Sequence, residues 1–287
     1  MANILQNKVA VITGSSRGLG YAIAETYARA GAKVVIAART QKAVDKAVRK
    51  LRLNGAQAEG LACDVSDIQQ VEALAEFAIR TFGGLDIWVN NAGISAPYGP
   101  TAHIPSSEFL KVIQTNITGT YNGSVVAMRH FVMQKHGKLI NLLGRGDNGS
   151  VPLQNAYSSS KIWVRNFTKA LASEYANSGV DIFGFNPGLV RTEMLSHIDA
   201  IVGYEKRLNP LRYVTLVWGN DADVPAQKAL WLASPASDGK NGMQLSVLTS
   251  RFKFTRLFES LWKWLLQKPN ELMELKITSV EPEISGD

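Results

Sequence analysis

Short apolar runs rich in β-branched residues alternate with longer amphipathic segments through most of this chain. The runs end in turn residues and predict buried strands at Val9 to Thr13, Lys33 to Ala37, Ala58 to Cys63, Leu85 to Asn90, Lys138 to Leu143, Asp181 to Phe185 and Met243 to Val247. The segments between them predict helices at Gly18 to Ala30, Gln41 to Leu53, Asp67 to Phe82, Ser107 to Gln134, Gln154 to Ser178 and Asp223 to Ala233. Strands joined by helical crossovers form a parallel sheet with helices on both faces. The sequence therefore predicts a doubly wound α/β fold.

The alternation predicts one domain over residues 1–248, followed by a C-terminal extension over residues 249–287. No apolar stretch reaches the roughly 18 to 20 residues that span a bilayer, and the chain before Val9 is too short for a secretory signal. Cys63 is the single cysteine and forms no internal disulfide. These features predict a cytoplasmic protein.

The formal net charge is +7 at pH 7. Lysine and arginine are interleaved with acidic residues along the helices, and no nucleic-acid-binding motif is present. We therefore expect no nucleic-acid partner and interpret the excess charge as a solvated surface with a site for an anionic cofactor.

A glycine-rich loop, Gly14 to Gly20, connects the first predicted strand to its helix. Such a loop lets backbone N–H groups at a helix N-terminus approach a pyrophosphate. After the second predicted strand, where NAD-binding chains carry an acidic residue for the ribose, this chain has Ala38 followed by Arg39. Arg17 and Arg39 are candidates to pair with a 2′-phosphate, which predicts NADP(H). The alternative for each is a solvated cation at a helix end.

Tyr157 and Lys161 are spaced i and i+4, so they share one face of the predicted helix. Reduction of a carbonyl needs a hydride at carbon and a proton for the oxygen, yet a free tyrosine titrates near ~10. A fixed neighbouring ammonium favours the phenolate. The pair predicts proton transfer by Tyr157, with Lys161 lowering its pKa.

Several motifs in a fixed order resemble the short-chain dehydrogenase/reductase family, which has a Rossmann-like fold. They are the glycine loop, Asp64, Asn90-Asn91-Ala92-Gly93, Asn116, Tyr157 with Lys161, and Asn186-Pro187-Gly188 through Thr192. The resemblance covers residues 5 to about 248. It implies that Tyr157 is the general acid/base, that Lys161 also binds the ribose, and that Asn116 holds a proton-relay water. It implies a cofactor site made of Gly14, Ser16, Arg17, Gly18, Leu19, Gly20, Arg39, Asp64, Val65, Asn91, Ala92, Gly93, Tyr157, Lys161, Pro187, Gly188, Val190 and Thr192.

The family places a serine thirteen residues before the tyrosine, and this chain has Gly144 there. Losing one preorganised donor costs about 10²–10³ in rate in other enzymes. Three accounts stay open. Arg145, Asn148 or Ser150 replaces the hydroxyl, the substrate carries its own donor, or the chain binds NADP(H) without efficient turnover.

The segment after Thr192 covers the substrate in the family, and we expect a lid over residues 189–222 with Met194 among the substrate contacts. The apolar residues of this segment indicate a lipophilic small-molecule substrate. His197 has no second histidine or carboxylate at metal spacing, so it is interpreted as a surface residue and no metal site is expected.

Phe254, Leu257, Phe258, Leu261, Trp262 and Leu265 fall on one face of a predicted C-terminal helix. Contact with the chain's own domain or with a second subunit is expected to cover this face, which favours a homo-oligomer. Attachment to a membrane surface is the alternative. The residues from about Thr278 onward are acidic and polar, and we expect them to be disordered.

Together these features predict an NADP(H)-dependent oxidoreductase that interconverts an alcohol and a ketone or aldehyde. The alternative is a regulatory or scaffold protein that binds NADP(H) but has lost turnover together with the serine.

Overall fold

The computed structural model describes residues 3–249, 252, 255–256 and 272–283. Its centre is a seven-stranded parallel sheet in the order β3-β2-β1-β4-β5-β6-β8. The strands are β1 (Val9–Thr13), β2 (Lys33–Ala38), β3 (Ala58–Ala62), β4 (Ile87–Asn90), β5 (Gly137–Leu142), β6 (Val180–Asn186) and β8 (Gln244–Ser246). Each lies within one or two residues of a predicted strand, which confirms the doubly wound fold.

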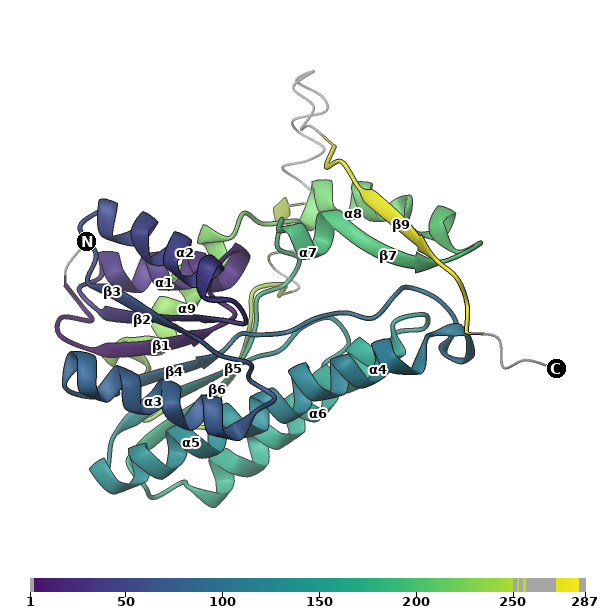
Figure 1. The fold of residues 1–287 in the computed structure, drawn as a ribbon. Helices are drawn as coiled ribbons and strands as arrows, with labels where there is room; N and C mark the ends of the chain where they lie inside the picture. Colours follow the sequence, from purple (N-terminus) through teal and green to yellow (C-terminus); the bar gives the residue numbers. More distant parts are fainter. Residues whose placement is uncertain (1–2, 250–251, 253–254, 257–271, 284–287) are drawn as a thin grey trace.

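Helices cover both faces of this sheet (Figure 1). The face-covering helices are α1 (Gly18–Arg29), α2 (Gln41–Leu53), α3 (Ile68–Phe82), α5 (Gly119–Gln134), α6 (Asn155–Glu174) and α9 (Asp223–Ala233). The first core cluster joins α1, α2 and α9 to one face, and the second joins α3, α5 and α6 to the other. Because both faces are covered, the central strands are apolar throughout rather than alternating.

Local sequence signals set the helix ends where they are strong. The Asp67 carboxylate accepts hydrogen bonds from the backbone N–H groups of Gln69 and Gln70, which caps the N-terminus of α3. Gly83 ends the same helix with a φ of 86°, a left-handed conformation that glycine adopts without strain.

The single helix predicted over Ser107 to Gln134 is divided in the structure. It consists of α4 (Ser106–Val112), a π-helical turn η2 (Ile113–Thr118) and α5. A π-helical turn widens the helix and often marks a functional site. This turn carries Asn116, which is fully buried.

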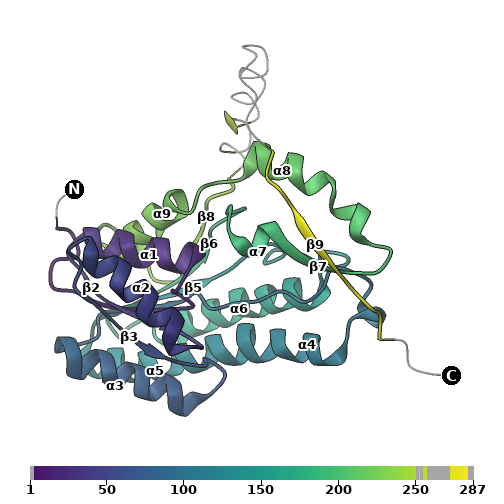
Figure 2. The same ribbon diagram turned by 45° about the horizontal axis from the view of Figure 1, so that its top comes forward.

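A second, smaller sheet lies beyond the carboxyl end of the main sheet. It pairs β7 (His197–Ile201) with β9 (Lys276–Val280) in parallel, close to α7 (Glu193–Ser196) and α8 (Pro210–Trp218), as Figure 2 shows. Three short turns complete the described elements: η1 (Thr101–His103), η3 (Glu205–Leu208) and η4 (Pro235–Ser237).

The prediction that the residues from Thr278 are disordered was wrong, because Thr278 to Val280 belong to β9. Pairing with β7 supplies backbone hydrogen bonds along one edge of this strand, and the Ser279 hydroxyl donates to the Glu205 carboxylate at 2.8 Å. The apolar face predicted over residues 254–265 lies outside the described residues. Within the described part of the chain, no helix combines the length and the apolar character needed to cross a bilayer.

Removing residues 272–287 deletes β9 and leaves one edge of β7 unpaired. We expect the melting temperature to fall by about 2–4 °C, which corresponds to roughly 1 kcal/mol in a chain of this size. Calorimetry measures the change, and removal of 284–287 alone is the matched control because it keeps β9. Unchanged melting after the longer deletion would contradict this account.

Removing residues 250–287 also deletes the predicted apolar face. We expect a further loss of thermal stability or a changed oligomeric state, measured by light scattering. The membrane alternative expects unchanged melting and assembly together with lost binding to anionic vesicles.

Candidate functional site

The glycine loop brings the backbone of β1 close to the residues after β4. A Cβ atom added at Gly14 would lie 2.8 Å from the Ala92 Cα, and one at Gly20 would lie 2.4 Å from the Asn91 Nδ2. Gly14 also has a φ of 63°, which disfavours other residues. Any side chain at these two positions would therefore force the loop apart.

The N-terminus of α1 is open to a bound anion. Its N-cap residue is Arg17, and no side chain caps the first turn. The first N–H groups of a helix have no partner within the helix and carry a partial positive charge. This backbone cradle fits the pyrophosphate of a dinucleotide.

Asn91 holds this cradle rather than pointing away from it. Its Nδ2 donates to the carbonyl oxygens of Thr13 at 2.9 Å and Gly14 at 3.1 Å. The backbone N–H groups of Asn91 and Ala92 both donate to the Thr13 hydroxyl at 3.1 Å. The motif after β4 thus fixes the end of β1.

The two arginines proposed for the cofactor phosphate have different surroundings. Arg17 is 74% exposed and forms an ion pair with Glu193 at the start of α7. Arg39 is exposed and directly follows Ala38 at the end of β2. In the glycine loop, Ser16 and Leu19 are half-buried.

The segment after β3 forms another side of the predicted cofactor site. The Asp64 Oδ1 accepts hydrogen bonds from the backbone N–H of Ser66 at 2.9 Å and from its hydroxyl at 2.7 Å. The Val65 carbonyl accepts from the Asn122 Nδ2 at 2.9 Å, which ties this segment to α5.

Tyr157 and Lys161 lie one turn apart on α6, as their spacing predicts. The Lys161 Nζ is 5.6 Å from the centroid of the Tyr157 ring and donates to the Leu142 carbonyl at 2.9 Å. Lys161 is 4% exposed, whereas Tyr157 is half-buried. The end of β5 therefore holds the ammonium beside the phenol.

The buried Asn116 reaches the same region from the π-helical turn. Its amide donates to the Ile94 carbonyl at 2.9 Å and to the Ser160 hydroxyl at 3.0 Å, and its Oδ1 accepts from the Ile94 N–H. A Cβ atom added at Gly93 would lie 3.4 Å from the Asn116 Oδ1 and 3.6 Å from the Lys161 Nζ. The structure thus brings together Gly93, Asn116 and Lys161.

The electrostatics around Tyr157 differ from the sequence-based expectation. Desolvation, together with the Asp147 carboxylate, raises the pKa of Tyr157 to about 12. Desolvation lowers the pKa of Lys161 to about 8, and Asp147 opposes that change. In this arrangement desolvation is the largest effect on the phenol, and it favours the protonated form of Tyr157.

Gly144 lies beside the Tyr157 hydroxyl. A Cβ atom added at Gly144 would be 2.4 Å from the Tyr157 Oη. The phenol therefore occupies space that a side chain at position 144 would need, and serine could enter only if the ring moved.

The residues proposed to replace the serine hydroxyl are on the outside of the following loop. Arg145, Asn148 and Ser150 are exposed, and Met194 on α7 is 51% exposed. In contrast, Asp147 from the same loop points inward and is 7% exposed.

Asp147 is paired with groups from two elements. Its Oδ2 accepts from the Arg165 Nη1 on α6 at 2.8 Å, and its Oδ1 accepts from the Asn186 Nδ2 at the end of β6 at 3.1 Å. Our reading of the sequence did not single out Asp147 or Arg165. The available signal was the spacing of Arg165, which is one further turn along the Tyr157 and Lys161 face.

The segment after β6 begins beside this cluster. The Asn186 Oδ1 accepts from the Gly188 N–H at 2.9 Å, and Pro187 and Val190 are buried. Thr192 is close to the glycine loop, because a Cβ atom added at Gly18 would lie 3.5 Å from its Cγ2. The glycine loop and the segment after β6, which both belong to the predicted cofactor site, therefore lie next to each other.

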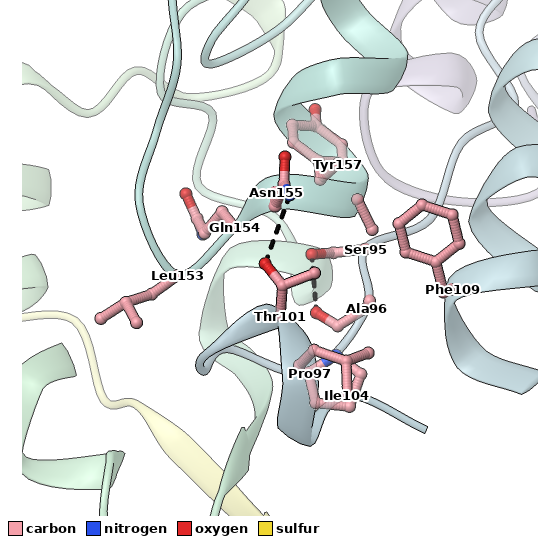
Figure 3. Close-up of a pocket in the computed structure, with 11 residues that line it drawn as sticks. Ser95, Ala96, Pro97, Thr101, Ile104, Phe109, Leu153, Gln154, Asn155 and Tyr157 are labelled. Carbon is pink, nitrogen blue, oxygen red and sulfur yellow. Dashed lines mark hydrogen bonds between the residues drawn. The ribbon is translucent and has the colours of Figure 1, made fainter. Parts of the chain in front are cut away.

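A small cavity borders the ring of Tyr157 (Figure 3). Phe109 and Ile104 give it apolar walls, and the Asn155 Nδ2 donates to the Thr101 hydroxyl at 3.2 Å. The buried Gln154 Oε1 has no hydrogen-bond partner among the described residues. The cavity is lined by Ser95, Ala96, Pro97, Thr101, Ile104, Phe109, Leu153, Gln154, Asn155, Ala156 and Tyr157.

Comparisons with known proteins agree with this arrangement. Residues 8–201 match the family described as short chain dehydrogenase. The 3beta-hydroxysteroid dehydrogenase 1 of Eggerthella lenta is 36% identical over 253 residues, which cover 86% of this chain and 94% of that protein. The chain belongs to the short-chain dehydrogenase/reductase family of oxidoreductases.

Solved structures of the same family have the same fold. A gluconate 5-dehydrogenase from Burkholderia cenocepacia, in complex with NADP and tartrate, has a TM-score of 0.76 at 31% identity and covers 85% of this chain and 94% of its own. A 3-ketoacyl-(acyl-carrier-protein) reductase from Brucella melitensis, complexed with NADH, has a TM-score of 0.75 at 29% identity and covers 85% and 97%.

Proposed function

We propose that this chain is an NADP(H)-dependent reductase of a ketone or aldehyde on a lipophilic small molecule. One observation carries the proposal: Tyr157 lies beside the buried Lys161 and borders a cavity that has apolar walls at Ile104 and Phe109. A protonated acid next to a carbonyl supplies the proton that the developing alkoxide needs.

The residues of this chain divide the task between them. The open N-terminus of α1 and the loop held by Asn91 bind the cofactor pyrophosphate, and NADPH supplies the hydride when bound. Tyr157 donates its phenolic proton to the substrate oxygen. Lys161 through the Leu142 carbonyl, and Asn116 through Ile94 and Ser160, hold the backbone around Tyr157 in place.

The cavity residues suggest how the substrate is oriented. Ile104 and Phe109 favour an apolar body, and the Gln154 side chain offers an amide for a polar group. The relative from Eggerthella lenta is named for a steroid alcohol, which fits an apolar substrate, whereas the gluconate dehydrogenase is named for a polar one. We therefore propose only the chemical class.

The cofactor preference is proposed from the end of β2. Ala38 offers no carboxylate to a ribose hydroxyl, and Arg39 is exposed beside it. Because Arg17 pairs with Glu193, we assign the 2′-phosphate first to Arg39.

Wild-type protein is expected to bind NADPH at least about tenfold tighter than NADH, and Arg39→Gln should remove most of that preference. A tenfold preference needs only about 1.4 kcal/mol, which a charge-assisted hydrogen bond supplies. Calorimetry with both cofactors measures it, and Arg49→Gln, an exposed arginine on α2, is the matched control. Equal wild-type affinities for the two cofactors would contradict the assignment.

The alternative proposal is a regulatory or scaffold protein that binds NADP(H) without turnover. Gly144 favours it, because no hydroxyl is present where the family has its serine. A panel of lipophilic and polar carbonyl compounds separates the two functions. Oxidation of NADPH with any of them supports the reductase, and tight NADPH binding without oxidation across the panel supports the alternative.

A further inference from the structure

The face of α6 that carries Tyr157 and Lys161 continues to Arg165, and the Asp147 carboxylate contacts Arg165 there. The Arg165 Nη1 donates to the Asp147 carboxylate at 2.8 Å, and the side chains are 20% and 7% exposed, so the carboxylate is buried and the arginine is half-buried. Burying an ion pair costs desolvation energy, and surface pairs contribute little. A pair at this position, on the helix face that carries the proposed acid, is therefore better explained by a role in the site than by a gain in stability.

The loop that carries Asp147 is tightly fitted to its neighbours. Gly146 has a φ of 90°, and a Cβ atom added there would lie 2.4 Å from the Ser158 Cβ on α6. The Asp147 N–H donates to the Gly144 carbonyl at 3.2 Å. The turn that passes beside the Tyr157 hydroxyl is thus closed by Asp147 itself.

Asn186 connects the same carboxylate to the segment after β6, which carries Pro187, Gly188, Val190 and Thr192 of the predicted cofactor site. Its Nδ2 donates to the Asp147 Oδ1 and to the Gly144 carbonyl, both at 3.1 Å. These bonds fix the orientation of the amide, and its Oδ1 then accepts from the Gly188 N–H. Asp147 therefore links α6, the Gly144 turn and the segment after β6.

We propose that Asp147, held by Arg165 and Asn186, is a positioning residue that fixes the Gly144 turn beside Tyr157 and places a negative charge near the phenol that donates the proton in carbonyl reduction. Tyr157, Lys161 and Arg165 face the carboxylate from α6, and the neutral amide of Asn186 faces it from β6. The proposal rests on the proposed function for its link to reduction. Its electrostatic part concerns this chain alone.

The charge of Asp147 acts on Tyr157 in a direction that can be tested. A nearby negative charge disfavours the phenolate, so removing it favours ionisation. Removing the positive charge of Arg165 should disfavour the Tyr157 phenolate, because the negative charge of Asp147 is then no longer partly neutralised by its partner. General loosening of the loop would move both variants the same way.

The experiment follows the ionisation of Tyr157 through its tyrosinate absorbance, as the difference between each protein and its Tyr157→Phe counterpart. Wild type is expected to titrate at about pH 12. Asp147→Asn should titrate about one pH unit lower, and Arg165→Met at or above the wild-type value. Glu72→Gln, which removes a carboxylate from the exposed ion pair with Arg129, is the control and should leave the titration unchanged.

Asp147→Asn leaves Arg165 without its anionic partner, so the variant Asp147→Asn with Arg165→Met is measured beside it. The proposal would be overturned if the titration of Tyr157 were unchanged in both Asp147→Asn and the double variant. It would also be overturned if Asp147→Asn and Arg165→Met lowered the titration pH of Tyr157 equally. The titration needs no turnover. If the wild-type protein reduces no carbonyl compound, the proposed function is wrong. The charge effect of Asp147 still stands if Asp147→Asn titrates lower than wild type and Arg165→Met does not.

Discussion

Tyr157→Phe is expected to reduce carbonyl-reductase turnover by about 10²–10⁴-fold, the range for loss of a general acid. We expect kcat and kcat/KM to fall equally, which marks an interaction made only in the transition state. NADPH affinity should therefore stay within about twofold of wild type. The phenylalanine ring keeps the apolar wall of the cavity and lacks only the hydroxyl beside Gly144.

Steady-state kinetics and cofactor titration measure these two quantities separately. Tyr121→Phe is the matched control, because Tyr121 on α5 is 48% exposed and is not among the cavity residues. If Tyr157→Phe turned over at the wild-type rate, another group would have to supply the proton.

Lys161→Met is expected to lower turnover by at least about a hundredfold and to weaken NADPH binding. The ammonium lies beside Tyr157 and is held by the Leu142 carbonyl, so its loss disturbs the phenol and the proposed ribose site together. This combined defect differs from that of Tyr157→Phe. Normal NADPH affinity in Lys161→Met would remove the proposed ribose contact.

The same substitution should have an opposite effect on stability. Burial lowers the pKa of Lys161 from 10.5 to about 8. Between these values the unfolded chain binds a proton that the folded chain does not, so wild-type stability rises with pH across the window. Below pH 8 both states are protonated and the cost, about 3 kcal/mol, is fully present.

Methionine removes this cost but leaves the Leu142 carbonyl without its donor, which costs about 1–3 kcal/mol. We therefore expect Lys161→Met to be at least as stable as wild type at pH 7, with an advantage that shrinks as the pH rises to about 10.5. Urea unfolding at several pH values measures the difference. A marked loss of stability at pH 7 would show that the ammonium is held more favourably than its burial indicates.

The central sheet could be predicted because its signal is local. Runs such as Val9 to Thr13 are apolar, short and bounded by turns, and their burial needs no knowledge of the rest of the chain. The small sheet could not be predicted in this way. The strands β7 and β9 have only five residues each, three of the five in β9 are exposed, and the two strands are far apart in the sequence, so no local pattern predicts their pairing.

The candidate site divides along the same line. The fixed order of motifs pointed to Tyr157, Lys161 and Asn116, and the structure brings these residues to one region. The inward turn of Asp147 depends on Gly146 fitting against Ser158 and on Arg165 facing it from α6. Neither contact has a signature in the residues around Asp147, so the exposed neighbours Arg145 and Asn148 appeared to be the better candidates.

The pairing of β7 with β9 also has a consequence for the order in which the molecule assembles. Paired residues such as His197 and Lys276 are 79 positions apart (276 − 197), and closing so long a loop costs entropy that only a few contacts repay. The main sheet can form without them. The small sheet is therefore expected to be the last part of the described chain to form during folding and the first to open by local unfolding.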